Sequence, residues 1–306
     1  MTMQNNYQVF HRKQDIGKRI SQLHREEQLS IGIVATGTVD ELISTLDDYA
    51  SRIPWALVVL MYEEFGRIVE LRMQYPSVTF IVFTNPVPLG MMINAMADEC
   101  YTTYFWITRS DLSIIRFEQE LLFTLLRRSD RPAAIIPIFA NRNGEVVPSI
   151  QAPMIRSDRI DPIPFFPIGE VVPTLYPFFG IGMYERALFQ RLRGFDANIS
   201  SDFWQFLDFG IRCWLYGYPL FAHPQFVLQF ISRQSVIEDR SDLHGMERCH
   251  TKALGIRQIN GKNYIRKFGK YTDNRMLHSE VKKRIALYKS DFYQLMDEWK
   301  APEEPR

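Results

Sequence analysis

The sequence predicts an α/β protein with a mixed, mainly parallel sheet flanked by helices and a helical C-terminal extension. Between residues 29 and 107, apolar runs of strand length alternate with stretches that have helical spacing. Each run is almost continuously apolar, which is typical of parallel strands covered on both faces. The 306 residues, 46% hydrophobic and 23% charged, suffice for one large domain or two smaller ones.

The expected elements of the first half follow from the apolar spacing, taken in chain order. Strands are expected at residues 29–38, 55–61, 78–83, 103–107 and 133–139. Helices are expected between them at residues 40–52, 63–74, 91–99 and 117–127. The turn signal Asn143-Gly144 then predicts a hairpin, so the strand–helix alternation ends there.

The second half of the chain has a different pattern. Residues 148–180 are rich in proline, glycine and aromatic residues, which predicts extended loops that wrap one face of the protein. A helix is expected at residues 185–192 and a strand at residues 221–230, with a second helix carrying Asp208 and Arg212 between them.

Composition divides the chain into three parts: an N-terminal polar, helical extension (1–28), a main domain (29–235) and a basic, helical C-terminal extension (236–306). No apolar run reaches the ~18 residues of a membrane span, and the N-terminus lacks the apolar core of a secretory signal. The three cysteines are widely spaced, so we expect reduced, structural thiols. A cytoplasmic protein is therefore expected, with the basic C-terminal tract open to contact with the inner membrane face.

Bulk charge and motifs exclude several ligand classes. The net charge of +1, from 36 basic and 35 acidic side chains, produces no field that would attract nucleic acid. Neither a GxGxxG after the first strand nor a GxxxxGK[ST] is present, which disfavours a classical dinucleotide site and a P-loop. The oligomeric state stays open.

Residues 182–218 carry the most informative pattern: a helix, a Gly194-Phe195-Asp196 turn, a polar loop and a second helix. This order resembles the acceptor half of the family 2 glycosyltransferases, which have the GT-A fold. The resemblance covers about residues 30–230, because 88–94, 103–111 and 143–145 are similar to further segments of that family. It implies inverting transfer of a sugar from a nucleotide-diphosphate donor to a glycan, cell-surface or lipid-linked acceptor.

The resemblance implies a donor site at the carboxyl ends of the first strands. The implied donor-binding residues are Thr36, Thr38, Tyr62, Glu63, Gly90, Asn94 and Arg109. Tyr62 would stack on the base and Glu63 would reach the ribose. Alternatively, the threonines need only form turns, and Glu63 needs only begin the next helix, whose dipole favours an acidic residue.

The family's metal motif, DxD, aligns with Arg109-Ser110-Asp111. Asp111 is the implied ligand of a divalent cation, Mn²⁺ or Mg²⁺, that would neutralise the diphosphate. Arg109 would either oppose this metal or replace it by pairing with phosphate. A second interpretation is that Asp111 caps a helix starting near Leu112.

The family's catalytic acidic pair is replaced here by Gln205-Phe206. Asp202 and Asp208 are the implied candidates for the base that accepts the acceptor's hydroxyl proton. Alternatively, Asp202 caps its own helix and Asp208 pairs with Arg212, four residues later.

Two further residues are implied to lie on the acceptor side. Trp204 would stack against a sugar, whereas Asp196 would either contact the acceptor or only stabilise its turn. The missing acidic residues support a second hypothesis, a catalytically degenerate protein that binds a nucleotide sugar, a glycan or a protein partner.

Overall fold

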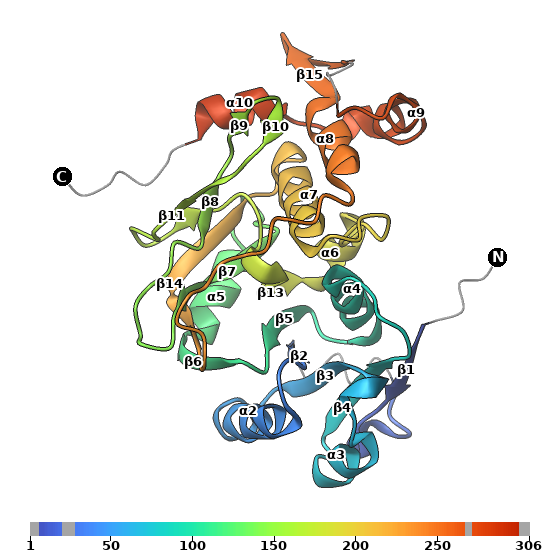
Figure 1. The fold of residues 1–306 in the computed structure, drawn as a ribbon, viewed down its shortest axis with the longest axis vertical. Coiled ribbons are helices and arrows are strands. Elements are labelled where there is room, and N and C mark those ends of the chain that lie inside the picture. Colours follow the sequence, from blue (N-terminus) through green and yellow to red (C-terminus); the bar gives the residue numbers. More distant parts are fainter. Residues whose placement is uncertain (1–5, 20–27, 267–270, 300–306) are drawn as a thin grey trace.

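The computed structural model describes residues 6–19, 28–266 and 271–299, and its centre is a ten-stranded sheet (Figure 1). The strands are β1 (Tyr7–Phe10), β2 (Leu29–Val34), β3 (Ala56–Tyr62), β4 (Val78–Phe83), β5 (Tyr104–Arg109), β6 (Leu112–Phe117), β7 (Ala134–Ala140), β12 (Val172–Pro173), β13 (Gly182–Glu185) and β14 (Leu220–Phe230). Their order is β1-β4-β3-β2-β5-β13-β7-β14-β12, and β6 pairs with β14. Strands β4, β3, β2 and β5 are parallel, as are β7 and β14.

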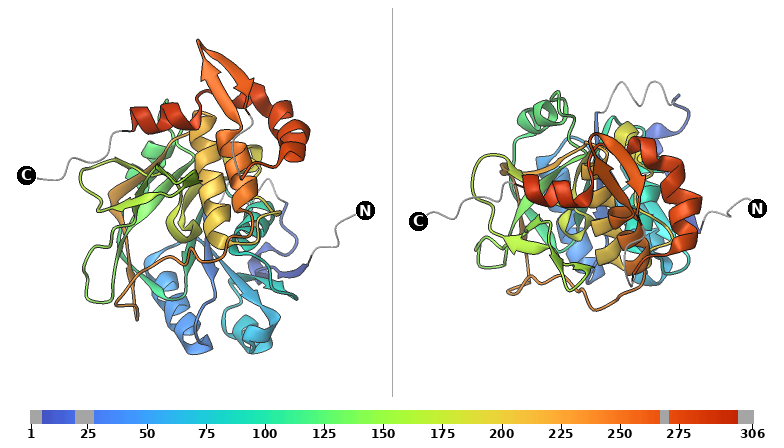
Figure 2. Two further views of the ribbon diagram at one scale, coloured as in Figure 1. Left: turned by 45° about the horizontal axis from the view of Figure 1, so that its top comes forward. Right: turned by 90° about the horizontal axis from the view of Figure 1, so that it is seen from above.

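Helices cover both faces of this sheet (Figure 2). The helices beside the sheet are α2 (Val39–Arg52), α3 (Ile68–Gln74), α4 (Leu89–Glu99), α5 (Gln119–Leu126), α6 (Arg186–Arg191) and α7 (Asp202–Leu215). Helices α8 (Met246–Leu254), α9 (Asn274–Met276) and α10 (Phe292–Glu298) follow in the C-terminal part. The predicted α/β class with a mixed sheet and flanking helices is confirmed.

Three local predictions about the main domain need correction. No helix starts near Leu112, because Ser110 and Asp111 form a tight turn and the chain returns as β6. The helix expected at 63–74 is broken into a 3-10 turn (Glu63–Phe65) and α3, since Gly66 and Arg67 both have positive φ. Strand β13 was not anticipated, although it lies antiparallel between β5 and β7.

The N-terminal extension is not purely helical. Tyr7–Phe10 forms β1, an antiparallel edge strand on β4, and within the described residues 11–19 only the 3-10 turn Lys13–Asp15 follows. Residues 20–27, part of the stretch expected to be helical, lie outside the described residues.

The aromatic-rich loops form short hairpins beside the sheet. β8 (Ile150–Ala152) pairs with β11 (Ile163–Phe165), and β9 (Ile155–Arg156) pairs with β10 (Arg159–Ile160). The C-terminal extension is helical as predicted, but it also contains the hairpin of β15 (Ile256–Ile259) and β16 (Lys262–Ile265). Figures 1 and 2 place this part at one end of the molecule, next to α7.

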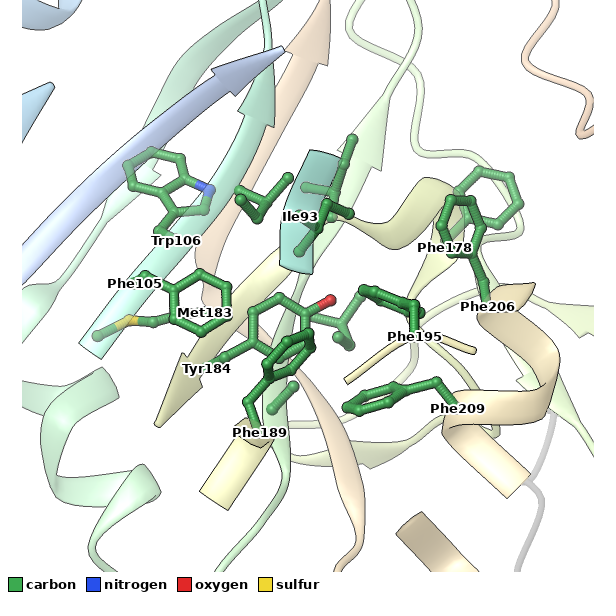
Figure 3. Close-up of a cluster of buried hydrophobic side chains, with 14 of the residues drawn as sticks. Ile93, Phe105, Trp106, Phe178, Met183, Tyr184, Phe189, Phe195, Phe206 and Phe209 are labelled. Atoms are coloured by element: carbon green, nitrogen blue, oxygen red, sulfur yellow. The ribbon is translucent and has the colours of Figure 1, made fainter. Parts of the chain in front are cut away.

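The core between the sheet and helices α4, α6 and α7 is strongly aromatic (Figure 3). Phe105 on β5 stacks on Tyr184 of β13 with ring centroids 5.1 Å apart. Phe195, in the turn before α7, packs against Phe209 with centroids 4.8 Å apart. Because such rings bury large apolar areas and interlock, this cluster fixes α7 on the sheet.

Two further findings concern the cysteines and the lengths of the helices. Cys100, Cys213 and Cys249 are buried and free, as predicted. Among the described residues, no helix is long and apolar enough to cross a membrane.

Candidate active site

The carboxyl ends of β2 and β5 meet at one edge of the sheet, as expected for parallel strands. Thr36, just after β2, is tied to Ser110, just after β5. The Ser110 hydroxyl accepts from the Thr36 amide at 2.7 Å and lies 2.6 Å from the Thr36 carbonyl oxygen, to which it donates. This clamp fixes the distance between the two strand ends and leaves Thr36 half-buried.

Thr38 and Glu63 occupy positions with a structural explanation. Thr38 is the N-cap of α2 and forms a capping box with Glu41. Glu63 is exposed at the start of its 3-10 turn. Neither the capping box of Thr38 nor the exposed position of Glu63 needs a ligand to explain it.

Tyr62, at the end of β3, holds the loop that follows β4. Its hydroxyl donates to the Val87 carbonyl at 2.7 Å, and burial raises the pKa of the phenol. Tyr62 therefore shapes the wall formed by residues 86–88.

Arg109 and Asp111 form a two-pronged ion pair across the turn between β5 and β6. The Nε and Nη2 atoms of Arg109 donate to the two Asp111 carboxylate oxygens, each at 2.9 Å. Arg233 donates to Asp111 Oδ2 from the other side at 3.0 Å. Both oxygens of Asp111 are thus engaged by guanidinium groups.

This arrangement does not fit a divalent cation. The positive charge beside Asp111 is already supplied by two arginines, and a metal would have to displace at least one of them. In the described parts of the chain, no group of three or more His, Cys, Asp or Glu side chains is placed to hold a metal ion. Arg109, only 11% exposed, binds both oxygens of the carboxylate that the family resemblance implied as the metal ligand.

Asp202 lies at the N-terminal end of α7, with Ser201 as the N-cap residue. Its side chain does not cap its own helix. Instead, Oδ1 accepts from the Leu89 amide of α4 at 2.8 Å. Asp202 thus caps a different helix, 113 residues away in the chain.

Asp202 is also exposed in a hollow of about 460 Å³ at this edge of the sheet. Its walls are formed by Pro86, Val87, Pro88, Ser200, Ser201, Asp202, Phe203, Asp239 and Asp242. Partial enclosure raises the pKa of Asp202, while the Leu89 hydrogen bond and the charge of Arg109 oppose that rise. A carboxylate with a raised pKa, open to solvent, is suited to accept a proton.

Gln205, at the position of the family's acidic pair, is fully buried and joins two segments. Its Oε1 accepts from the Gly90 amide at 2.9 Å, and its Nε2 donates to the Asp196 carbonyl at 3.0 Å. A Cβ on Gly90 would lie 2.3 Å from Gln205 Oε1 and 2.6 Å from Phe195 Cβ. Gly90 is therefore explained by close packing of α4 on α7.

Asn94 and Asp196 belong to a different wall of the molecule. Asn94 exchanges two hydrogen bonds with the Phe195 backbone, at 2.8 and 2.9 Å. Asp196 accepts from Arg248 at 2.6 Å and from Lys252. Burial acts to raise the pKa of Asp196, but Lys252 and Arg248 outweigh it and hold the pKa well below its ordinary value.

Asp208 is 2% exposed, in the middle of α7. It accepts from Arg212 at 3.0 Å and from Lys252 at 2.7 Å. This is the intrahelical pair considered as the alternative, extended by a second cation from α8. A carboxylate so enclosed has no path to an acceptor hydroxyl.

Trp204 is 2% exposed and packs between Phe203 and His250, with centroid distances of 5.0 and 5.3 Å. Its ring faces are therefore covered by neighbouring side chains. Of the predicted residues, Thr36, Tyr62, Arg109, Asp111 and Asp202 lie at one edge, and Thr38, Glu63 and Gly90 lie close by, at the same strand ends and at the start of α4. The structure places Asn94, Asp196, Trp204 and Asp208 in other contacts.

A segment that links β14 to α8, residues 231–245, lies across this edge (Figure 1). Arg233 pairs with Asp111, and Glu238 accepts from the Tyr176 hydroxyl at 2.6 Å. Arg240 donates to Gln151 at 3.0 Å. Sequence reasoning missed these residues, because the segment has no periodic pattern and its partners lie far away in the chain.

No protein-family model and no curated protein matches the chain. Among solved structures, the crystal structure of GalNAc-T7 with UDP, GalNAc and Mn²⁺ is similar over 89% of this chain, with a TM-score of 0.62 and 15% identity. The chain spans only 56% of that structure's length. S. aureus TarS is similar over 66% of this chain and 36% of its own, with a TM-score of 0.46 and 15% identity. The chain thus has a GT-A-like glycosyltransferase fold, as expected.

Proposed function

We propose that the protein is a divergent family 2 glycosyltransferase. It would bind a nucleoside-diphosphate sugar at the edge of Thr36, Tyr62 and Arg109, and transfer the sugar to a hydroxyl of a glycan or lipid-linked acceptor. The observation that carries the proposal is Asp202, an exposed carboxylate with a raised pKa at this edge of a GT-A-like sheet.

The transfer is a single inverting displacement. The acceptor oxygen forms a bond to the anomeric carbon, the bond from that carbon to the diphosphate breaks, and the acceptor's proton passes to Asp202. Asp202 keeps its orientation because Leu89 holds Oδ1. The second oxygen, Oδ2, accepts no hydrogen bond from the described residues and is left for the proton.

Arg109 would neutralise the charge that develops on the departing diphosphate. A guanidinium pairs with phosphate through two parallel hydrogen bonds, so it can take this role without a metal. Arg109 is only 11% exposed and shares its partner Asp111 with Arg233, so Arg233 would have to leave Asp111 for a diphosphate to reach Arg109. Donor binding therefore displaces part of this segment.

The acidic hollow would receive sugar rather than phosphate. Asp202, Asp239 and Asp242 repel a diphosphate but accept hydrogen bonds from sugar hydroxyls. The acceptor would thus enter beside Asp202, and Arg109 would hold the donor on the sheet side. In this proposal residues 29–235 form the catalytic unit, in the cytoplasm or at the inner membrane face.

The test is release of nucleoside diphosphate from a panel of nucleotide sugars with a glycan acceptor. Asp202→Asn should reduce turnover by about 100-fold or more, since general base catalysis contributes that much, and should leave binding of the nucleoside diphosphate intact. Asp297→Asn, exposed on α10 and outside the hollow, is the control and should keep most of the turnover. Equal turnover in Asp202→Asn and the wild type would exclude Asp202 as the base.

A second candidate function is binding without catalysis. It is favoured by Gln205 and Asp111, whose polar atoms are fully used in internal contacts where the family has reactive carboxylates. A ligand-induced rise in thermal stability with one nucleotide sugar, together with no diphosphate release in any condition, would support this function over transfer.

A further inference from the structure

A second cavity, of about 390 Å³, shares no lining residue with the hollow at Asp202. It lies between the turn after α6, helix α8 and the C-terminal segment of the π-helix Leu277–Val281 and the 3-10 helix Lys282–Leu287. Its lining residues are Asn94, Arg193, Phe195, Asp196, Ala197, Asn198, Arg212, Arg248, Lys252, Glu280 and Arg284. Asn94 and Asp196, which the family resemblance implied for donor and acceptor binding, are in this lining, but neither has a part in the transfer proposed above.

One wall of the cavity is held together by a network of ion pairs. Arg248 donates to Asp196 at 2.6 Å and to the two oxygens of Glu280 at 3.1 and 2.8 Å. Lys252, one helical turn later, is 9% exposed and bridges Asp196 to Asp208. The carboxylates in and behind this wall are therefore already matched by cations.

Two arginines in the lining remain unmatched. The guanidinium groups of Arg193 and Arg284 form no ion pair or hydrogen bond within the described parts of the chain. Arg193 is exposed and Arg284 is half-buried. At the base of the cavity, Arg212 is 6% exposed, and its Nε is buried without a hydrogen-bond partner among the described residues.

The charge balance of the cavity is positive. Arg193, Arg212, Arg248, Lys252 and Arg284 supply five cations, whereas Asp196, Glu280 and the underlying Asp208 supply three carboxylates. The two surplus positive charges match a phosphate monoester, whose charge at pH 7 is about −1.5 to −2. The volume is within the range of small-molecule sites, so a group larger than phosphate alone fits.

We propose that this cavity binds a small phosphate monoester, with the phosphate held between Arg193 and Arg284. Guanidinium groups bind phosphate oxygens with strong, charge-assisted hydrogen bonds. The wall of Arg248 and Lys252 is already held by ion pairs, so it need not rearrange when phosphate binds to Arg193 and Arg284. The site does not depend on nucleotide-sugar binding at the sheet edge.

Calorimetric titration of the full chain with inorganic phosphate, glucose 6-phosphate and glucose tests the site. Phosphate and glucose 6-phosphate should bind, and glucose should not. Arg193→Ala/Arg284→Ala should weaken binding of both phosphate compounds by about tenfold or more, since two charge-assisted contacts are lost. Tighter binding of glucose 6-phosphate than of inorganic phosphate would identify a sugar phosphate as the ligand, and equal binding would identify free phosphate.

The matched control is Arg191→Ala/Lys283→Ala, which removes the same charge from exposed neighbours outside the cavity. It should bind as the wild type does, and circular dichroism should show that both double variants are folded. Saturating UDP should not displace either phosphate compound. Unchanged affinity in the Arg193/Arg284 variant, displacement by UDP, or no binding to the wild type would overturn the proposal.

Discussion

Gln205 and Gly90 are joined by a hydrogen bond of 2.9 Å that crosses from α7 to the first turn of α4. The same side chain donates to the Asp196 carbonyl at 3.0 Å, so its amide acts as acceptor and donor at once. A glutamate could accept from Gly90, but its second oxygen would face a carbonyl oxygen. The departure from an acidic residue at this position therefore has a structural cause.

Gln205→Glu should lower the free energy of unfolding by about 1–3 kcal/mol, because the Asp196 carbonyl loses its donor and a charge is buried. Urea unfolding monitored by circular dichroism measures the change. Gln74→Glu, an exposed glutamine at the end of α3, should change stability by no more than about 0.5 kcal/mol. Equal stability of Gln205→Glu and the wild type would mean that the hydrogen bond from Gln205 to the Asp196 carbonyl does not contribute to stability.

Removal of divalent cations should not change nucleotide binding, because Arg109 and Arg233 already neutralise Asp111. Saturating UDP should raise thermal stability equally in Mn²⁺ and in EDTA, by about 2.7 kcal/mol at 100 times the Kd. Arg109→Ala should abolish most of this stabilisation, whereas Arg116→Ala, exposed on β6, should retain it. Stabilisation seen only with Mn²⁺ would contradict this arrangement.

Glu238 should make stability depend on pH near neutrality. Burial raises the pKa of this carboxyl to about 7, despite the hydrogen bond from Tyr176 and the charge of Arg240. Between about pH 4.5 and 7 the folded state then binds more protons than the unfolded state, so the free energy of unfolding falls as pH rises. The loss is of the order of 3 kcal/mol.

Glu238→Gln removes this titration. Compared with the wild type, the variant should gain relative stability on going from pH 5 to pH 8, measured by urea unfolding at each pH. Glu247→Gln on α8 is the control and should follow the wild-type slope. Parallel curves for Glu238→Gln and the wild type would show that Glu238 titrates alike in both states.

His250 should give the free energy of unfolding a pH dependence of opposite sign to that from Glu238, and at lower pH. Burial lowers the pKa of this imidazole to about 4, opposed by the hydrogen bond to the Met246 carbonyl and aided by the charge of Arg159. Its Nε2 accepts from the Ile160 amide at 2.9 Å, which only the neutral ring can do. Between about pH 6.5 and 4 the unfolded state binds more protons, so the free energy of unfolding falls as pH falls. The effect is of the order of 3 kcal/mol.

Histidine proton shifts in NMR spectra measure this directly. The His250 resonance should stay that of a neutral ring from pH 8 to pH 5, and His250→Gln should lose the acid-side slope of stability. His278→Gln, at an exposed position, should keep that slope. A His250 resonance that titrates near pH 6.5 would contradict the closed, neutral ring.

Most strands and helices of the main domain could be predicted because burial has a local period. Continuous apolar runs identified β2, β3, β4 and β5, and helical spacing identified α2, α4 and α5. Short elements escaped, since β13 and β1 have only four residues each. Length does not explain Leu112, which was expected to start a helix but starts the six-residue strand β6, because the partner strand β14 lies more than 100 residues later in the chain.

The sequence by itself determined the α/β class, the parallel central strands and the gathering of Thr36, Tyr62 and Arg109 at one edge. Only the tertiary structure decided what the polar side chains do. Asp111 meets Arg233, 122 residues later, and Gln205 meets Gly90, 115 residues earlier. Local periodicity encodes which face of an element is buried, whereas a hydrogen-bond partner depends on which distant segment the completed fold brings within about 3 Å.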